Sequence, residues 1–113
     1  MGVNALTRSR DFQRVQATGR RGHSDGVVVV AARGSDPGSP SRFGLSIGRS
    51  VGGAVTRNRV KRRLRAAWAQ AAMPPGYEVV LRGSPAVVRA PFQELVEHLE
   101  RAVTRATSFG RSA

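Results

Sequence analysis

The alternation of apolar and polar residues along the chain predicts four strands. Residues 27–32 form an unbroken apolar run with four valines, which is typical of a buried strand. Residues 42–47 and 77–82 alternate, and residues 20–23 form a short polar strand before a glycine-rich turn. In the 42–47 stretch one face is apolar, whereas the other carries little besides glycine and serine. Another group can therefore lie close against the backbone on that bare face.

Apolar residues at helical spacing predict three helices. The first begins at Ser9, its expected cap, and ends before Gly19. The second runs over about residues 56–72 and ends before a Pro-Pro-Gly sequence. The third starts near Pro91. Its inner face is predicted to consist of Phe92, Leu95, Val96, Leu99, Val103 and Ala106.

The order of these elements predicts an α+β fold, a two-layer sandwich in which helices pack on one sheet. With 113 residues, 40% of them apolar, the chain has the size of one domain spanning residues 1–113. We expect frayed tails at residues 1–8 and 107–113. We also expect a polar loop at residues 34–41.

The net charge of the chain limits the kinds of partner that it is expected to bind. Nineteen cations against seven acids give a net charge of +12, and such self-repulsion is relieved by nucleic acid or by an anionic membrane. No apolar run approaches the roughly 20 residues that span a bilayer, and residues 1–6 lack the pattern of a signal peptide. The chain has no cysteine, so it has no disulfide and no thiolate metal site. We expect a cytoplasmic protein without a membrane partner.

The strongest feature is the basic start of the second helix, where six of the nine residues 57–65 are Arg or Lys. The predicted core stripe of this helix is Val60, Leu64, Ala67, Trp68 and Ala71. The helix dipole disfavours cations in the first turns, by up to about 1 kcal/mol each, but the same place suits a phosphate. A solvated face would mix signs, and no acid occurs between Asp36 and Glu78. The segment predicts a helix that binds a polyanion, and it does not by itself distinguish RNA from DNA.

Weaker features leave alternatives open. Phe12 either packs in the core or stacks an unpaired base, which contributes about 1–3 kcal/mol. His23 and His98 are too isolated for a metal site or a catalytic pair, and the acids are scattered. We therefore expect no catalytic residue, no metal site and no bound cofactor in the chain, and any chemistry is expected to belong to a partner.

Five segments together resemble the bacterial ribonuclease P protein family. The most specific is Arg-Asn-Arg-Val-Lys-Arg-Arg-Leu-Arg at 57–65, and residues 11–15, 44–47, 51–55 and 75–80 agree in content and order. The resemblance implies a fold of αβββαβα order, like that of a small-subunit ribosomal protein domain. It also implies a left-handed βαβ crossover through the basic helix, against the usual hand of such units.

In that family a large RNA removes the 5′ leader from precursor tRNA, while the protein helps to bind the substrate and lowers the metal requirement. The resemblance therefore implies a subunit of an endoribonuclease. Its expected partners are ribonuclease P RNA, bound one-to-one by a monomer, and precursor tRNA. Mg²⁺ is expected to be needed by the RNA rather than held by the protein.

Positions can be carried over from the family motif. The RNA-facing set would be Arg57, Asn58, Arg59, Lys61, Arg62 and Arg65. A leader cleft between the first helix and the sheet would include Arg8, Phe12, Arg14 and Val30. Gln16 and Val30 stand where the family commonly has aromatic residues. We therefore expect weaker stacking on the leader and a larger share of backbone contacts.

Other functional classes remain as alternatives. One is a structural or ribosomal RNA-binding protein with no role in processing. A second is a nuclease with its own active site, and a third is a DNA-binding helix module. Restored cleavage by ribonuclease P RNA at low magnesium would favour the family function, whereas cleavage by the RNA-free chain would favour a nuclease.

Overall fold

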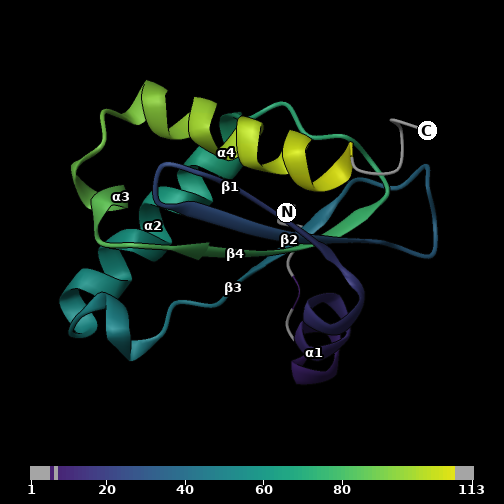
Figure 1. Ribbon diagram of the computed structural model, residues 1–113, viewed down its shortest axis with the longest axis horizontal. Helices are drawn as coiled ribbons and strands as arrows, with labels where there is room; N and C mark the ends of the chain where they lie inside the picture. Colours follow the sequence, from purple (N-terminus) through teal and green to yellow (C-terminus); the bar gives the residue numbers. More distant parts are fainter. Residues whose placement is uncertain (1–5, 7, 109–113) are drawn as a thin grey trace.

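The computed structural model describes Leu6 and residues 8–108, and in this part of the chain it contains one four-stranded sheet with helices on both sides (Figure 1). The elements in chain order are α1 (Ser9–Thr18), β1 (Arg20–Ser24), β2 (Val27–Arg33), β3 (Arg42–Leu45), the short 3-10 helix η1 (Arg49–Val51), α2 (Ala54–Gln70), β4 (Tyr77–Gly83), α3 (Ala86–Arg89) and α4 (Phe92–Thr107). The predicted α+β class is confirmed. The short helix α3 was not predicted.

The sheet has the strand order β1-β2-β4-β3. Strand β2 pairs antiparallel with β1 and β4, and β3 pairs parallel with β4. A tight turn closes the β1–β2 hairpin at Asp25 and Gly26, which both have positive φ angles (44° and 90°). The connection from β3 to β4 passes through α2, so the basic helix is the crossover between two parallel strands.

Each face of the sheet has its own core. The larger core joins one face to α2 and α4, and alternate residues of β2 such as Val27 and Val29 point into it. The smaller core lies on the opposite face, under α1, and contains Val30 of β2 together with Val15 and Val80. Since both faces of β2 are covered, its sequence is an unbroken apolar run rather than an alternating one. We call the second side the α1 face.

Element ends differ from the sequence-based expectations. Leu6 is buried and donates its backbone N–H to the Phe43 carbonyl over 2.8 Å, and α4 continues to Thr107. The predicted frayed tails are therefore wrong at these inner positions. Residues 1–5, 7 and 109–113 lie outside the described part. Arg8, not Ser9, is the N-cap of α1, and no side-chain hydrogen bond caps the helix within the described residues.

Helix α2 begins at Ala54 and ends at Gln70, two residues earlier at each end than predicted. The strand predicted for 42–47 ends at Leu45, although the Ser46 N–H still bonds to the Leu81 carbonyl over 2.9 Å. No helix within the described residues combines the length and the apolar character needed to cross a membrane.

Candidate nucleic-acid interface

The orientation of α2 is fixed by its apolar stripe. Val60, Leu64 and Ala67 have no exposed surface, as the sequence predicted. Trp68 stacks on Phe43 with ring centroids 4.7 Å apart. Because this stripe faces the larger core, the remaining sides of the helix carry its charged residues.

The start of α2 offers free backbone amides. The residue before the helix is Gly53, which has no side chain to cap these groups, and the first turn contains no acid. Gly52, one residue earlier, has a φ of 147°, a conformation that L side chains rarely adopt. The chain therefore enters α2 through a turn that needs glycine and leaves the positive end of the helix dipole without a negative partner.

The predicted RNA-facing residues lie on this helix and are accessible. Asn58, Arg59, Arg62 and Arg65 are exposed, and Arg57 and Lys61 are half-buried. None of these cations forms an ion pair with a carboxylate of the described residues. The Nε atom of Arg57 is buried and has no hydrogen-bond partner there. Leaving such a donor unpaired is costly.

One cation of α2 has a different task. Arg63 donates from Nη1 to the carbonyls of Val87 and Val88, over 3.1 and 2.7 Å. These carbonyls belong to α3, so Arg63 ties the short helix to α2. In the sequence, Arg63 is one of the six cations of the segment 57–65, and no separate role was predicted for it. No sequence pattern indicates a bond to carbonyls more than 20 residues away.

An apolar side chain lies among the cations. Val55, in the first turn of α2, is 68% exposed and is the one exposed large hydrophobic residue of the described chain. It lies three and four residues before Asn58 and Arg59, which places the three side chains on one side of the helix. The sequence-based site set omitted Val55, although it lies only two residues before the basic segment 57–65.

The α1 face brings Phe12 against the sheet. The ring lies over Gly44, where a Cβ atom would be only 2.3 Å from the ring Cζ. Phe12 is the group that approaches the bare face of β3, and it remains half-buried at the edge of the smaller core. Val30, another residue predicted for the leader cleft, is only 3% exposed beneath α1 and offers almost no surface to a ligand.

Ion pairs join α1 to the sheet. Arg14 pairs with Glu78 of β4, and with Asp11 over 3.2 Å. Arg42 of β3 reaches Glu78 over 3.4 Å and Asp11 over 3.9 Å. The hydrogen bond to Glu78, followed by that to Asp11, raises the pKa of the Arg14 guanidinium above its usual value. Arg14 is thus committed to holding α1, whereas Arg8 is exposed at the helix start.

Beyond Phe12, the α1 face carries a second basic group that sequence analysis missed. Val28 pairs with Arg82 on the neighbouring strand, and Arg21 pairs with Val30, so both arginines point to the same face as Val30. A cavity of about 330 Å³ lies here, lined by Arg21, Val28, Arg82 and Ser84 together with two glycines. The lining contains cations and no carboxylate.

His98 is not isolated, which corrects the sequence-based expectation. Its Nδ1 lies 2.8 Å from the Ser24 hydroxyl, and its Nε2 lies 3.2 Å from Asp25. Ser24 is 5% exposed, and Arg101 approaches the same hydroxyl at 3.5 Å. The group ties the β1–β2 turn to α4 and closes over the serine. Among the described residues, no three His, Asp or Glu side chains are grouped so that they could hold a metal ion.

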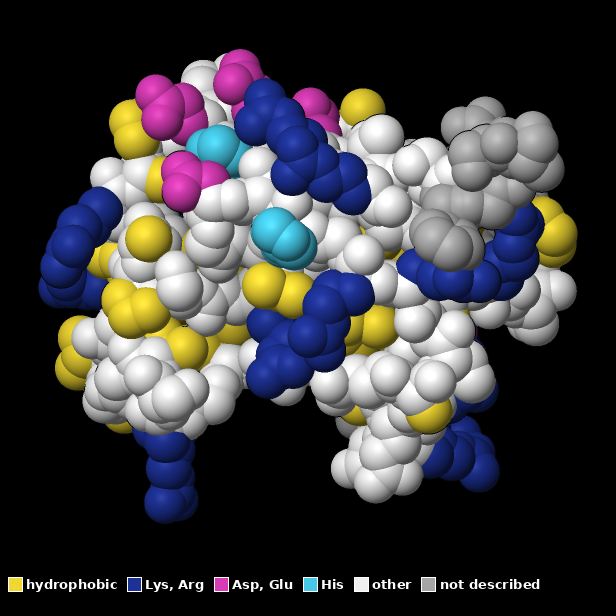
Figure 2. Space-filling view, in the orientation of Figure 1, with side chains coloured by type: hydrophobic (Ala, Val, Ile, Leu, Met, Phe, Trp, Pro, Cys, Tyr) yellow, Lys and Arg dark blue, Asp and Glu magenta, His cyan; other side chains and the backbone are white. Residues whose placement is uncertain are grey.

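Three acids lie on α4, which also carries Arg101 and Arg105. Acidic side chains gather over α4 in the view of Figure 2, where Glu94 and Glu97 are exposed. Glu100 of α4 accepts a hydrogen bond from the Ala72 N–H just after α2, over 2.8 Å. These carboxylates therefore leave the basic face of α2 without neutralisation.

Sequence comparison decides the family. A sequence model of the family Ribonuclease P matches residues 2–107. A protein of Clavibacter michiganensis is 41% identical over 105 residues, covering 91% of this chain and 92% of its own length. One of Acidothermus cellulolyticus is 38% identical over 104 residues, covering 90% and 87%. Both are described as ribonuclease P protein components. The chain belongs to the ribonuclease P protein family.

Solved structures of ribonuclease P proteins share the fold. That of Staphylococcus aureus has a TM-score of 0.75 at 20% identity and covers 96% of this chain and 99% of its own. That of Thermotoga maritima has a TM-score of 0.77 at 24% identity and covers 89% and 96%. The fold of this chain therefore matches that of solved ribonuclease P proteins. As a member of this family, the chain is a subunit that serves tRNA processing.

Proposed function

We propose that the chain assists a catalytic RNA in removing the 5′ leader from precursor tRNA, and that it binds the RNA through the start of α2. The observation that carries the proposal is the set of unpaired cations around an uncapped helix start, with the buried Arg57 Nε lacking an acceptor. A phosphate would accept from the free amides and from exposed guanidinium groups of the same helix. In this proposal a monomer forms a one-to-one cytoplasmic ribonucleoprotein with ribonuclease P RNA.

The proposal assigns the chemistry to the RNA, with Mg²⁺ required by the RNA and no cofactor held by the protein. Ser24, His98 and Asp25 have the composition of a hydrolytic triad, but the buried hydroxyl lies between His98 and Arg101. Hydrolysis would need this hydroxyl to reach a substrate. The arrangement instead favours a structural role for the three residues.

Reconstitution tests the function. The chain is added to ribonuclease P RNA at a magnesium concentration too low for the RNA alone, and cleavage of precursor tRNA is measured. We expect restored cleavage at the 5′ leader junction, and none from the RNA-free chain. Binding to the RNA without restored cleavage would instead favour the second candidate, a structural or ribosomal RNA-binding protein. Cleavage by the RNA-free chain would refute the assignment of the chemistry to the RNA.

On the α1 face we propose that the leader passes over Phe12 toward the basic cavity at Arg21 and Arg82. One half-buried aromatic ring is available for stacking, and the two arginines supply contacts to the phosphates. Because the two contact types lie apart on the sheet, binding should depend on leader length. Holoenzyme affinity is measured for precursors with leaders of one to eight nucleotides.

We expect affinity to rise with leader length until the leader reaches both arginines. Arg82→Ala should remove the gain in affinity that the longer leaders provide. Phe12→Leu should remove the gain in affinity that the shorter leaders provide. If affinity is the same for one and for eight nucleotides, the leader does not use this face.

Val55 adds an apolar contact to the proposed α2 interface. A valine that contacts a base or a ribose contributes binding energy that does not depend on counterion release. Val55→Ala should therefore weaken RNA binding while the dependence on salt stays the same, because no charge is removed. A changed salt slope would contradict this contact.

A further inference from the structure

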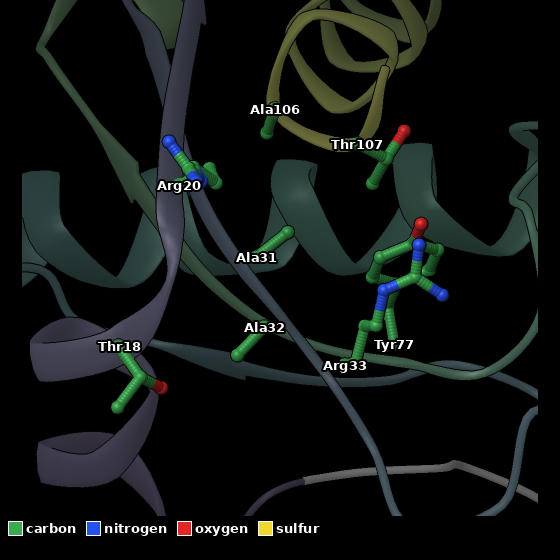
Figure 3. A pocket seen from close by; sticks show the side chains of 8 residues that line it. All are labelled: Thr18, Arg20, Ala31, Ala32, Arg33, Tyr77, Ala106 and Thr107. Carbon is green, nitrogen blue, oxygen red and sulfur yellow. The ribbon is translucent and has the colours of Figure 1, made fainter. Parts of the chain in front are cut away.

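A second cavity lies where β1 begins and β2 ends (Figure 3). Its volume is about 420 Å³, which is within the size range of small-ligand pockets. Three small side chains line it, Ala31, Ala32 and Ala106, together with Arg33 and Tyr77. It is separate from α2, which contributes none of the lining residues.

The register of the sheet explains why this space is open. Strand β1 begins at Arg20, which pairs with Ala31, whereas β2 continues to Arg33. The last two residues of β2 pair with β4 on one side, Arg33 with Tyr77, and have no β1 partner on the other. Larger residues at the alanine positions would fill the gap, so the cavity follows from the sequence as well as from the topology.

The cavity combines an aromatic ring with cations. The guanidinium carbon of Arg33 lies 5.8 Å from the centroid of the Tyr77 ring, and Figure 3 shows the two side chains next to each other. Arg20 supplies a second guanidinium at the opposite wall, and Thr107 also lines the cavity. None of the described residues that line the cavity has a carboxylate, and the adjacent Glu78 is held by Arg14 and Arg42 on the α1 face.

We propose that this cavity receives one unpaired nucleotide of the partner RNA. The base lies against the planar groups of Tyr77 and Arg33, and its phosphate contacts a guanidinium. Base stacking would explain why a ring and a guanidinium lie side by side next to Ala31 and Ala106, and a phosphate would be attracted by the arginines of the lining. The inference rests on the proposed RNA-binding function and adds a second contact away from α2 and from the leader.

Direct binding is measured on the tyrosine itself. Tyr77 is the single tyrosine of the chain, so selective ¹³C labelling of tyrosine gives one set of ring signals in an NMR spectrum. The full chain is titrated with adenosine 5′-monophosphate, with a short unstructured oligoribonucleotide, and with inorganic phosphate. We expect the ring signals to shift with both nucleotide probes and to stay in place with phosphate. No shift with either nucleotide probe, or an equal shift with phosphate alone, would overturn the proposal.

Variants separate stacking from charge in the complex with ribonuclease P RNA. Arg33→Lys keeps the charge but removes the planar group, and we expect about a fivefold or greater loss of affinity without a change of salt slope. Arg10→Lys is the matched control, because Arg10 is exposed on α1 and lies outside the cavity, and it should bind like the wild type. Tyr77→Phe should also keep the affinity.

These results also separate the two proposals. If Arg33→Lys binds RNA as tightly as Arg10→Lys does, the nucleotide site is refuted, and the function of α2 is unaffected. If the wild-type chain does not bind the RNA at all, the proposed function itself fails. Thermal melting of each variant shows whether a lost affinity reflects unfolding.

Discussion

Two groups of arginines in this molecule differ in whether they form ion pairs with carboxylates. On the α1 face, Arg14 and Arg42 share the carboxylates of Asp11 and Glu78, so each cation has two anionic partners. On α2, Arg57 and its neighbours have none among the described residues. The same residue type holds a helix on a sheet in the first group and faces outward without a partner in the second.

The difference shows which charges the fold needs. With only seven acids available, two of them serve one cluster that fixes α1, and others gather on α4. Arg63 is intermediate between the two groups. It lies in the basic segment, but its guanidinium donates hydrogen bonds to carbonyls of α3. Pairing within the chain therefore separates structural arginines from those left for a ligand more clearly than position in the sequence does.

The largest expected effect comes from the unpaired group. Replacing Arg57, Arg62 and Arg65 together with alanine should abolish tight RNA binding, because three phosphate contacts are lost. The slope of log affinity against log salt should become shallower by about 0.7–0.9 for each contact. Binding is measured by titration at several salt concentrations. The control is Arg42→Ala, which removes a charge from the paired group and should leave the slope nearly unchanged.

A smaller effect is expected from the paired group. Glu78→Gln leaves Arg14 and Arg42 with one shared carboxylate, and it should lower the free energy of unfolding by about 2 kcal/mol. The Glu78 side chain is only 12% exposed, so solvent replaces it poorly. Urea unfolding measures the loss. Affinity for ribonuclease P RNA at the α2 interface should not change, and a large loss there would break the comparison.

Arg63→Ala should lower the free energy of unfolding by about 1 kcal/mol, because the carbonyls of Val87 and Val88 lose a charged donor. Its salt slope should match that of the wild type although a charge of the basic segment is gone. If the slope of log affinity against log salt is as shallow for Arg63→Ala as for Arg62→Ala, Arg63 belongs to the RNA-binding group instead.

The smallest effect concerns Asp36, which forms no ion pair with a cation of the described residues. The hydroxyl of Ser39 and then the N–H of Gly38 lower the pKa of Asp36. A lowered pKa in the folded state stabilises the fold above the pKa of the unfolded chain, and this contribution is lost as the pH falls through the folded-state value. The melting temperature of Asp36→Asn should lie slightly below that of the wild type at pH 7, and the difference should shrink as the pH falls below the usual pKa range of an aspartate. An equal difference over this whole pH range would show that the charge has no part in it.

Much of the fold could be predicted because its periodicities are clear. The apolar stripe of α2 and the covered strand β2 follow from side-chain spacing, and so does the inner face of α4. The bare face of β3 predicted a close approach, but only the structure shows that the ring of Phe12 makes it. The partner lies more than 30 residues away, and no local pattern encodes such a pairing.

The candidate site was predictable in part for the same reason. The density of cations on one helix is a local property, so the α2 residues could be named from sequence. Long-range contacts changed the roles of others, including Arg63 on the α3 carbonyls and His98 on the hairpin turn. The two arginine-lined cavities depend on the register between strands, which the sequence does not specify.

The clustering of acids over α4 has a kinetic consequence. Three of the seven carboxylates lie on α4, whereas the predicted RNA-facing cations of α2 have no carboxylate partner among the described residues, so the charge of the molecule is unevenly distributed. The field of a long polyanion acts on this uneven charge and favours an approach in which the start of α2 leads. Productive collisions are thereby enriched over random ones.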